Sequence, residues 1–170
     1  MYCIAKNSDK DFTVFYTFAS WCGPCIANLP DAVNFSETNN ANMYVLLIDG
    51  EWGRSDVANA VAILKKKNIT QPAVILSDSL YPTAKLRNKK PAKFVLVDFG
   101  IQNRKKYANF VKLITPQRFK PENGMSKYII FNKEGEVVFV SNSDDCINEK
   151  GEYDYSLLLN KMSSALKTIP

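Results

Sequence analysis

The chain has 170 residues, of which 46% are hydrophobic and 12% aromatic, and its formal net charge is +5. This length and composition predict one globular domain, residues 1–170, and exclude an intrinsically disordered chain. Lys and Arg are spread along the chain, most densely at 65–67 and 104–106. We therefore expect solvated helix ends and loops there, and no nucleic-acid partner.

The sequence has no apolar stretch of about 18 residues, so no transmembrane segment is predicted. Residues 1–6 lack the basic start and the apolar core of a signal peptide. The four cysteines are too few and too scattered for a dense disulfide framework. A cytoplasmic location is expected unless a signal segment has been removed.

The first half of the chain alternates strand and helix patterns. A brief run at residues 2–5 is compatible with an edge strand, and the nearly continuous apolar run at 12–19 predicts a central strand. A helical stripe follows the strand and consists of Ile26, Leu29 and Val33. Pro30 should kink this helix. Residues 43–48 predict a second buried strand.

A second helix is predicted after Ser55, which can cap it. Its apolar stripe consists of Val57, Ala60, Val61 and Leu64. The basic run at 65–67 then suits the negative end of the helix dipole. Pro82 is expected to open a short helix.

Residues 84–115 are predicted to contain a strand at 94–97 and then a helix, because a structureless loop of that length is unusual. The helical stripe consists of Tyr107, Phe110, Val111 and Ile114. Either packing or partner recognition would account for this segment.

The C-terminal part predicts a hairpin and a last helix. Strands at 127–131 and 136–141 flank a turn in which Gly135 supplies a positive φ. The last helix carries a stripe of Tyr155, Leu158, Met162 and Leu166. The element order predicts an α/β fold with a central mixed sheet flanked by helices on both faces.

Two cysteines, Cys22 and Cys25, lie between the first strand and the first helix. A thiolate, not a thiol, attacks disulfides, and a helix N-terminus can lower a cysteine pKa from about 8.5 to roughly 3.5–7.5. The second sulfur lies one turn on, where it can resolve a mixed disulfide. Gly23 permits a tight turn, and Pro24 gives up only an N–H that the first helical turn leaves unpaired.

A zinc site is the rival interpretation, and it needs two further Cys or His ligands. The chain has no histidine, and Cys3 and Cys146 are isolated in the sequence. We therefore predict no metal site and no cofactor, although two close thiolates would also suit Cu(I) handling. Whether Cys3 and Cys146 form a disulfide depends on their distance, which the sequence leaves open.

Residues 18–25, Phe-Ala-Ser-Trp-Cys-Gly-Pro-Cys, resemble the active site of the thioredoxin superfamily. Residues 28–30, Asn-Leu-Pro, resemble its TlpA/ResA-like branch of thiol–disulfide oxidoreductases. The resemblance covers about residues 12–83 and 116–168. It implies a thioredoxin-like fold in which 84–115 is an insertion. It also implies a periplasmic or other cell-envelope setting, with a membrane-bound thiol reductase as electron donor.

The chain departs from the family pattern at three positions. Aligned with the family's hairpin, Ser126 occupies the place of a cis-proline, and a trans Met125–Ser126 bond is expected because a cis bond without proline costs about 2.5–4 kcal/mol. Pro91 is a rival for that role. Tyr16 and Asn28 stand where the family carries a buried acid. Water, or a residue such as Asp49 or Glu51, would have to take the proton.

The resemblance implies a protein thiol–disulfide oxidoreductase in which Cys22 attacks and Cys25 resolves. Its substrate groove would be lined by Trp21, Gly23, Pro24, Met125 and Ser126. A thioredoxin-like binding module with slow or inactive cysteines is the alternative, favoured by the missing proline and acids. Whether the protein reduces or oxidises its partners stays open, because the potential depends on how strongly the Cys22 thiolate is stabilised.

Overall fold

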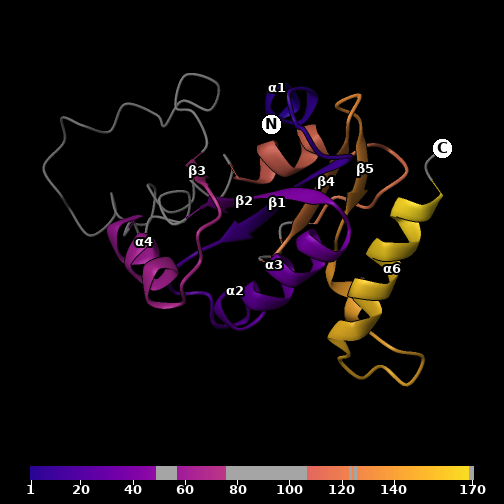
Figure 1. The fold of residues 1–170 in the computed structure, drawn as a ribbon. Helices are drawn as coiled ribbons and strands as arrows, with labels where there is room; N and C mark the ends of the chain where they lie inside the picture. The colour runs from indigo at the N-terminus through magenta and orange to yellow at the C-terminus, as the bar shows by residue number, and fades with distance from the viewer. Residues whose placement is uncertain (49–56, 76–106, 123, 125, 169–170) are drawn as a thin grey trace, which may run out of the picture.

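The computed structural model describes residues 1–48, 57–75, 107–122, 124 and 126–168. Figure 1 shows a central sheet with helices on both sides. In chain order the named elements are α1 (Tyr2–Lys6), β1 (Phe12–Phe18), α2 (Gly23–Ala27), α3 (Leu29–Thr38), β2 (Ala41–Leu47), α4 (Val57–Lys66), β3 (Ala73–Ile75), β4 (Tyr128–Asn132), β5 (Val137–Val140), the short 3₁₀ helix η2 (Ser143–Cys146) and α6 (Tyr155–Lys167). Residues 107–114 are also helical.

The five strands form one mixed sheet in the order β3-β2-β1-β4-β5. β1 and β3 are parallel to β2, whereas β4 is antiparallel to both β1 and β5. The central strand β1 is buried almost throughout, because it has a strand on each side and helices on both faces. This arrangement confirms the predicted α/β, thioredoxin-like fold, with β3 as an additional edge strand.

Each face of the sheet has its own aromatic layer. On one face, the Tyr128 ring packs against Tyr16 with centroids 5.0 Å apart and against Phe35 of α3 at 6.3 Å. On the other face, Phe15 packs against Phe131 at 5.7 Å. Figure 1 places α2, α3 and α6 on the first side, and α1 and the helix at 107–114 on the second. The redox motif therefore lies at one end of β1, on the side of α3 and α6.

Two local predictions are corrected by the structure. Residues 2–6 form a helix, not an edge strand: the Ala5 N–H donates to the Met1 carbonyl at 2.9 Å, and only Ala5 is buried. Pro30 breaks the helix rather than kinking it, since α2 ends and α3 begins at Asn28. Pro30 then lies in the first turn of α3, where its missing N–H is not needed. The buried face of α3 consists of Leu29, Ala32, Phe35 and Ser36, while Val33 is only half-buried.

The C-terminal predictions are confirmed. The β4–β5 hairpin turns at Gly135, whose φ is +82°, and the Gly135 N–H donates to the Asn132 carbonyl at 3.0 Å. A Cβ at Gly135 would lie 2.6 Å from the Tyr2 ring, so α1 also requires a glycine there. The predicted stripe of α6 is buried at Leu158, Met162 and Leu166.

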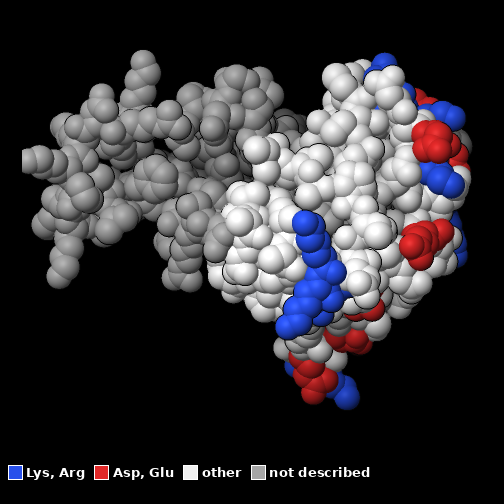
Figure 2. All heavy atoms as spheres, turned by 60° about the vertical axis from the view of Figure 1, so that its left-hand side comes forward, with Lys and Arg blue, Asp and Glu red and all other residues white. Residues whose placement is uncertain are grey.

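The helix at 107–114 is confirmed, with Tyr107, Phe110 and Val111 buried. The other predictions for the insertion, including the strand at 94–97, lie outside the described residues, as do Ser55 and Pro82. None of the described helices has the length and apolarity needed to cross a bilayer. On the face shown in Figure 2, charged side chains of both signs are scattered over the described surface, and much of it is uncharged.

Candidate functional site

Cys22 and Cys25 form a disulfide at the start of α2, with the sulfur atoms 2.08 Å apart. Cys22 is 6% exposed and Cys25 is fully buried. The turn that carries them is fixed by the Cys22 N–H, which donates to the Ala19 carbonyl at 3.0 Å. An incoming thiol or disulfide can therefore approach only the Cys22 side of the pair.

The backbone of α2 points a donor at the outer sulfur. Cys22 is the N-cap residue, and the Cys25 N–H donates to Cys22 Sγ at 3.2 Å. When the disulfide is reduced, the same N–H favours the thiolate at Cys22. Pro24 lies in the first turn, as predicted, and a Cβ at Gly23 would meet no atom within 4 Å. Trp21 is half-buried and packs against the core.

Ser126 faces the redox pair from the segment before β4. Its Oγ lies 3.9 Å from Cys22 Sγ, and its φ is +58°, in the left-handed region. The following residue is tied to β1 twice: the Lys127 N–H donates to Thr17 Oγ1 at 2.8 Å, and the Thr17 N–H donates to the Lys127 carbonyl at 2.9 Å. Met125 and Pro91 lie outside the described residues.

The position of the family's first buried acid holds a phenol. Tyr16 is fully buried, and its O–H donates to the Cys25 carbonyl at 3.0 Å. Burial raises the pKa of Tyr16, so this group keeps its proton at neutral pH. The second position, Asn28, is half-buried and joins α2 to α3. Asp49 and Glu51, the other candidates, lie outside the described residues.

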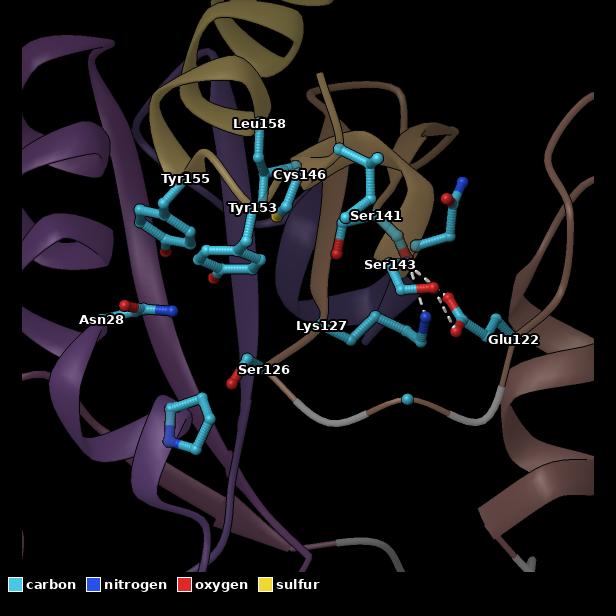
Figure 3. Close-up of a pocket in the computed structure, with 14 residues that line it drawn as sticks. Asn28, Glu122, Ser126, Lys127, Ser141, Ser143, Cys146, Tyr153, Tyr155 and Leu158 are labelled. Atoms are coloured by element: carbon cyan, nitrogen blue, oxygen red, sulfur yellow. Dashed lines mark hydrogen bonds between the residues drawn. The ribbon is translucent and has the colours of Figure 1, made fainter. Parts of the chain in front are cut away.

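A cavity of about 210 Å³ adjoins the redox pair. Figure 3 shows it between α2, the segment before β4 and the start of α6. Its lining includes Pro24, Asn28, Ser126, Lys127, Cys146 and Tyr155. The motif thus supplies one wall of the cavity, and distant parts of the chain supply the other walls.

Lys127 is the buried cation of this cavity. It is 2% exposed, and its Nζ donates to the Ser141 carbonyl at 2.6 Å. Burial lowers the pKa of Lys127 to about 8, against the opposing effects of the Glu122 and Asp145 carboxylates. Figure 3 shows its amine turned toward Ser141 and Ser143 rather than toward α2. The sequence predicts only that Lys127 begins a strand, and it does not predict that the amine is buried.

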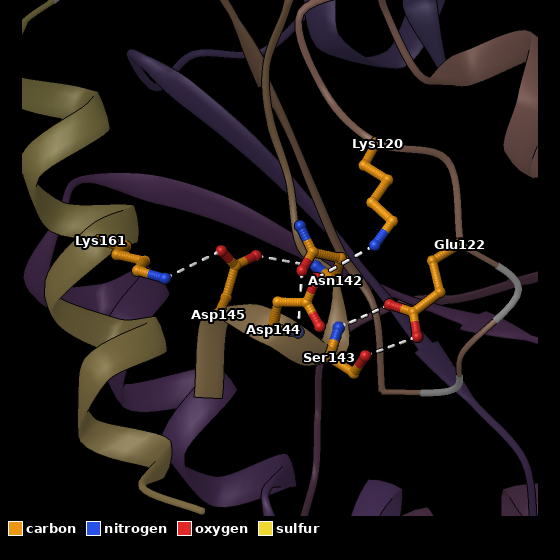
Figure 4. A network of polar contacts seen from close by, with 7 residues as sticks. All are labelled: Lys120, Glu122, Asn142, Ser143, Asp144, Asp145 and Lys161. Carbon is orange, nitrogen blue, oxygen red and sulfur yellow. Dashed lines mark hydrogen bonds and ion pairs between the residues drawn. The ribbon is translucent and has the colours of Figure 1, made fainter. Parts of the chain in front are cut away.

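A polar network holds the far wall of the cavity (Figure 4). The Glu122 carboxylate accepts bonds from the N–H and the hydroxyl of Ser143, at 2.5 and 2.6 Å. Burial raises the pKa of Glu122, but the two Ser143 bonds and Lys127 outweigh it, and the net pKa is lowered. Asn142 caps η2 through the Asp144 N–H at 2.9 Å. These bonds fix the turn that carries Cys146.

The two remaining cysteines are both free thiols, so they do not form a disulfide with each other. Cys3 is exposed on α1, whereas Cys146 is buried at the end of η2. Burial raises the pKa of the Cys146 thiol, which makes it a weak nucleophile at neutral pH. Within the described part of the chain, no three His, Cys, Asp or Glu side chains converge as a metal site would require.

No protein-family model matches the chain, and no curated protein matches it. Its fold is similar to that of solved thioredoxin-like structures. The thioredoxin domain of a thiol-disulfide oxidoreductase from Bacteroides vulgatus is 11% identical, with a TM-score of 0.48, over 92% of this chain and 80% of that one. A secreted disulfide oxidoreductase of Mycobacterium tuberculosis, homologous to E. coli DsbE, is 13% identical, with a TM-score of 0.46, over 94% and 82%.

StoA from Bacillus subtilis is 14% identical, with a TM-score of 0.44, over 79% of this chain and 75% of StoA. At such identities, likeness bears on the fold alone. The chemistry is therefore inferred from the site itself.

Proposed function

We propose that the protein is a thiol–disulfide oxidoreductase that exchanges disulfides with protein substrates. The observation that carries this proposal is the asymmetry of the Cys22–Cys25 pair. Cys22 keeps 6% of its surface exposed and its sulfur accepts a backbone N–H, while Cys25 is fully buried. Such a pair suits a nucleophile and a resolving thiol.

The reaction balances without a cofactor. In the reducing direction, the Cys22 thiolate attacks one sulfur of a substrate disulfide, and the other sulfur leaves as a thiolate that takes up a proton. The Cys25 thiol then loses its proton and attacks Cys22 Sγ. The Cys22–Cys25 bond forms as the mixed disulfide between Cys22 and the substrate breaks, and the second substrate sulfur leaves as a thiolate that takes up a proton, so the substrate has gained two electrons. Oxidation of a substrate dithiol is the reverse sequence.

The remaining site residues belong to the proposal as the docking surface for an extended substrate segment. Trp21, Gly23 and Pro24 would flank the outer sulfur on the motif side, with Ser126 across from them; Met125 is proposed for the same groove from the hairpin alignment alone and lies outside the described residues. A cell-envelope setting and a membrane-bound thiol reductase as electron donor are also proposed, and they rest on the resemblance of the motif to the TlpA/ResA-like branch.

A non-catalytic binding module is the second candidate, and specific observations favour it. Tyr16 is a protonated phenol and Asn28 is a neutral amide. Neither can therefore replace the buried carboxylate that would accept a proton from Cys25. Ser126, at φ +58°, also presents a backbone that proline cannot adopt, since the proline ring fixes φ near about −65°. Partner binding without exchange would fit both features.

Trapping of a mixed disulfide tests the proposal. In Cys25→Ser the resolving thiol is absent, so a small disulfide-bonded protein should remain attached to Cys22, as seen by mass spectrometry. Cys22→Ser is the matched control, and it should give no adduct because Cys25 is fully buried. If Cys25→Ser gives no adduct although Cys22 is alkylated normally, the enzyme proposal fails and the binding module takes its place.

A further inference from the structure

We infer that the Ser126 hydroxyl stabilises the Cys22 thiolate by donating a hydrogen bond to it when the disulfide is reduced. The hydroxyl is the second donor at this sulfur: its Oγ lies 3.9 Å from Cys22 Sγ, and the Cys25 N–H lies at 3.2 Å. Only its consequence for exchange rests on the proposed function. The hydrogen bond itself is a property of the reduced pair.

The direction of approach makes the two donors complementary. The Cys25 N–H belongs to the backbone of α2, whereas Ser126 reaches the sulfur from a segment 104 residues away in the sequence. A neutral thioether-like sulfur in the disulfide is a weak acceptor, which fits the long distance of 3.9 Å. A thiolate is a charged acceptor, and hydrogen bonds to charged groups are shorter and about twice as strong as neutral ones.

The backbone holds Ser126 where this bond can form. A φ of +58° is uncommon for a residue other than glycine. The next residue, Lys127, is bonded to Thr17 of β1 through both its N–H and its carbonyl. The strand register therefore fixes the segment, and rotation about the Ser126 Cα–Cβ bond directs the hydroxyl either to Cys22 Sγ or to the Tyr16 phenol, its other hydrogen-bond partner.

Charged groups nearby do not replace this donor. The ionisable groups of the surrounding described elements are the Cys25 thiol on α2, Tyr16 on β1, Asp31 on α3, Glu122 and Lys127 before β4, and Cys146, Tyr153 and Tyr155 around the cavity. Lys127 and Glu122 carry opposite charges, and their polar ends are bonded to Ser141 and Ser143. Asp49 and Glu51 lie outside the described residues. Among the described residues, the donors bonded to the sulfur are therefore both neutral.

The test is the pKa of Cys22 in the reduced protein. Its rate of alkylation by iodoacetamide is followed against pH, and the adduct is assigned to Cys22 rather than the other cysteines by fragment mass. Ser126→Ala and Ser126→Gly both remove the hydroxyl, but they differ in backbone: Ala keeps the strain of φ +58° and Gly relieves it. If the backbone strain sets the Cys22 pKa, the two variants should differ in that pKa. If the hydroxyl sets it, both variants should show the same pKa.

We expect both variants to raise the pKa of Cys22 by about one unit, a tenfold change that corresponds to about 1.4 kcal/mol. At a pH above both pKa values, where Cys22 is fully a thiolate, the reduction potential should fall by about 30 mV, because the reduced form there loses the same tenfold factor in a two-electron couple. At a fixed pH below the pKa, alkylation should slow only about threefold, since a more basic thiolate is also more nucleophilic.

The inference is overturned if both variants titrate within 0.2 unit of the parent, or if only one of them shifts, each judged on protein that keeps the parent's circular dichroism. Should Ser126→Ala fail to fold, the less strained Ser126→Gly decides alone. Failure of the proposed function would look different. If the variants show the pKa shift but Cys25→Ser forms no mixed disulfide, the hydrogen bond from Ser126 is supported and the oxidoreductase function is rejected.

Discussion

The two sides of the cavity beside the disulfide are built in opposite ways. The motif side is lined by Pro24 and Asn28, which belong to one continuous stretch whose geometry follows from a helix start. The wall side gathers three separate segments, near Lys127, Cys146 and Tyr155. The motif side relies on local backbone bonds, whereas the wall side exists only once the sheet and α6 have assembled.

The two sides also differ in how their reactivity is set. In the described part of the chain, Cys22 Sγ lies beside a backbone N–H and a hydroxyl, which stabilise negative charge without carrying any. On the wall side, burial is the largest cause of each shift: it lowers the pKa of Lys127 to about 8 and raises the pKa of Cys146. Cys22 thus has uncharged donors beside its sulfur, whereas Cys146, in the lining of the cavity, is a thiol whose pKa is raised by burial.

The largest expected effect comes from placing a proline where the wall side meets the motif. Ser126→Pro should lower the free energy of unfolding by about 3 kcal/mol or more, because proline cannot adopt φ +58° and the Lys127–Thr17 bonds hold the segment in place. The urea midpoint at unchanged m-value measures it.

Ser126→Gly is the control for that substitution. Relief of the left-handed conformation should stabilise the fold by about 1 kcal/mol. A proline variant as stable as the parent would show that the segment refolds around it, and the difference between the two sides of the cavity would then be one of side chains alone.

The second prediction concerns the buried amine. The Lys127 pKa is about 8 in the folded state against 10.5 for the ordinary group, so the unfolded chain binds more protons between these values. Stability therefore rises with pH in this window. Relative to Lys127→Met, the parent should gain about 2 kcal/mol between pH 7.5 and 10, measured by urea unfolding at several pH values.

The comparison with Lys127→Met is needed because other groups titrate nearby. Burial raises the pKa of Tyr16, Tyr128 and Tyr155, so their unfolded forms lose protons first and stability falls above about pH 10. An exposed lysine of the same hairpin serves as the matched control: Lys133→Met should leave the pH profile unchanged. Parallel profiles for the parent and Lys127→Met would mean that the amine is solvated.

Sequence reasoning reached most of the fold because it depends on regular patterns. The apolar run of β1, the stripe of α6 and the glycine of the β4–β5 turn each determine their element locally. It was wrong for α1, where five residues are too few to distinguish a strand from a helix turn. It also expected a kink where Pro30 instead starts a new helix, because proline suits a first turn as well as it disrupts an interior.

The candidate site was only half predictable for the same reason. Cys22 and Cys25 were identified from their spacing, and aligning the hairpin with the family pattern placed Ser126 opposite them. The cavity and its buried amine depend on contacts between segments far apart in the sequence, which no local pattern encodes. One signal was present: Lys127 opens an otherwise apolar strand. Such a lysine is either at the surface or bonded inside, and only the fold distinguishes the two.

The smallest expected effect tests whether the inner cysteine is held from behind. Tyr16→Phe removes the hydrogen bond to the Cys25 carbonyl, which lies just before the break between α2 and α3. The free energy of unfolding should fall by about 1 kcal/mol. Amide hydrogen exchange should also rise in α2, because its last turn loses a tie to β1.

Tyr128→Phe is the matched control on the wall side of the same aromatic layer. It removes the contact between the Tyr128 and Tyr155 hydroxyls, so it should cost a similar free energy. Exchange should then rise at the start of α6 and not in α2. Equally raised exchange in α2 for both variants would show that the two tyrosines are coupled through their packing, because loss of either hydroxyl would then loosen α2 and the start of α6 together. Selective exchange would instead show that Tyr16 holds Cys25 in place by a single bond.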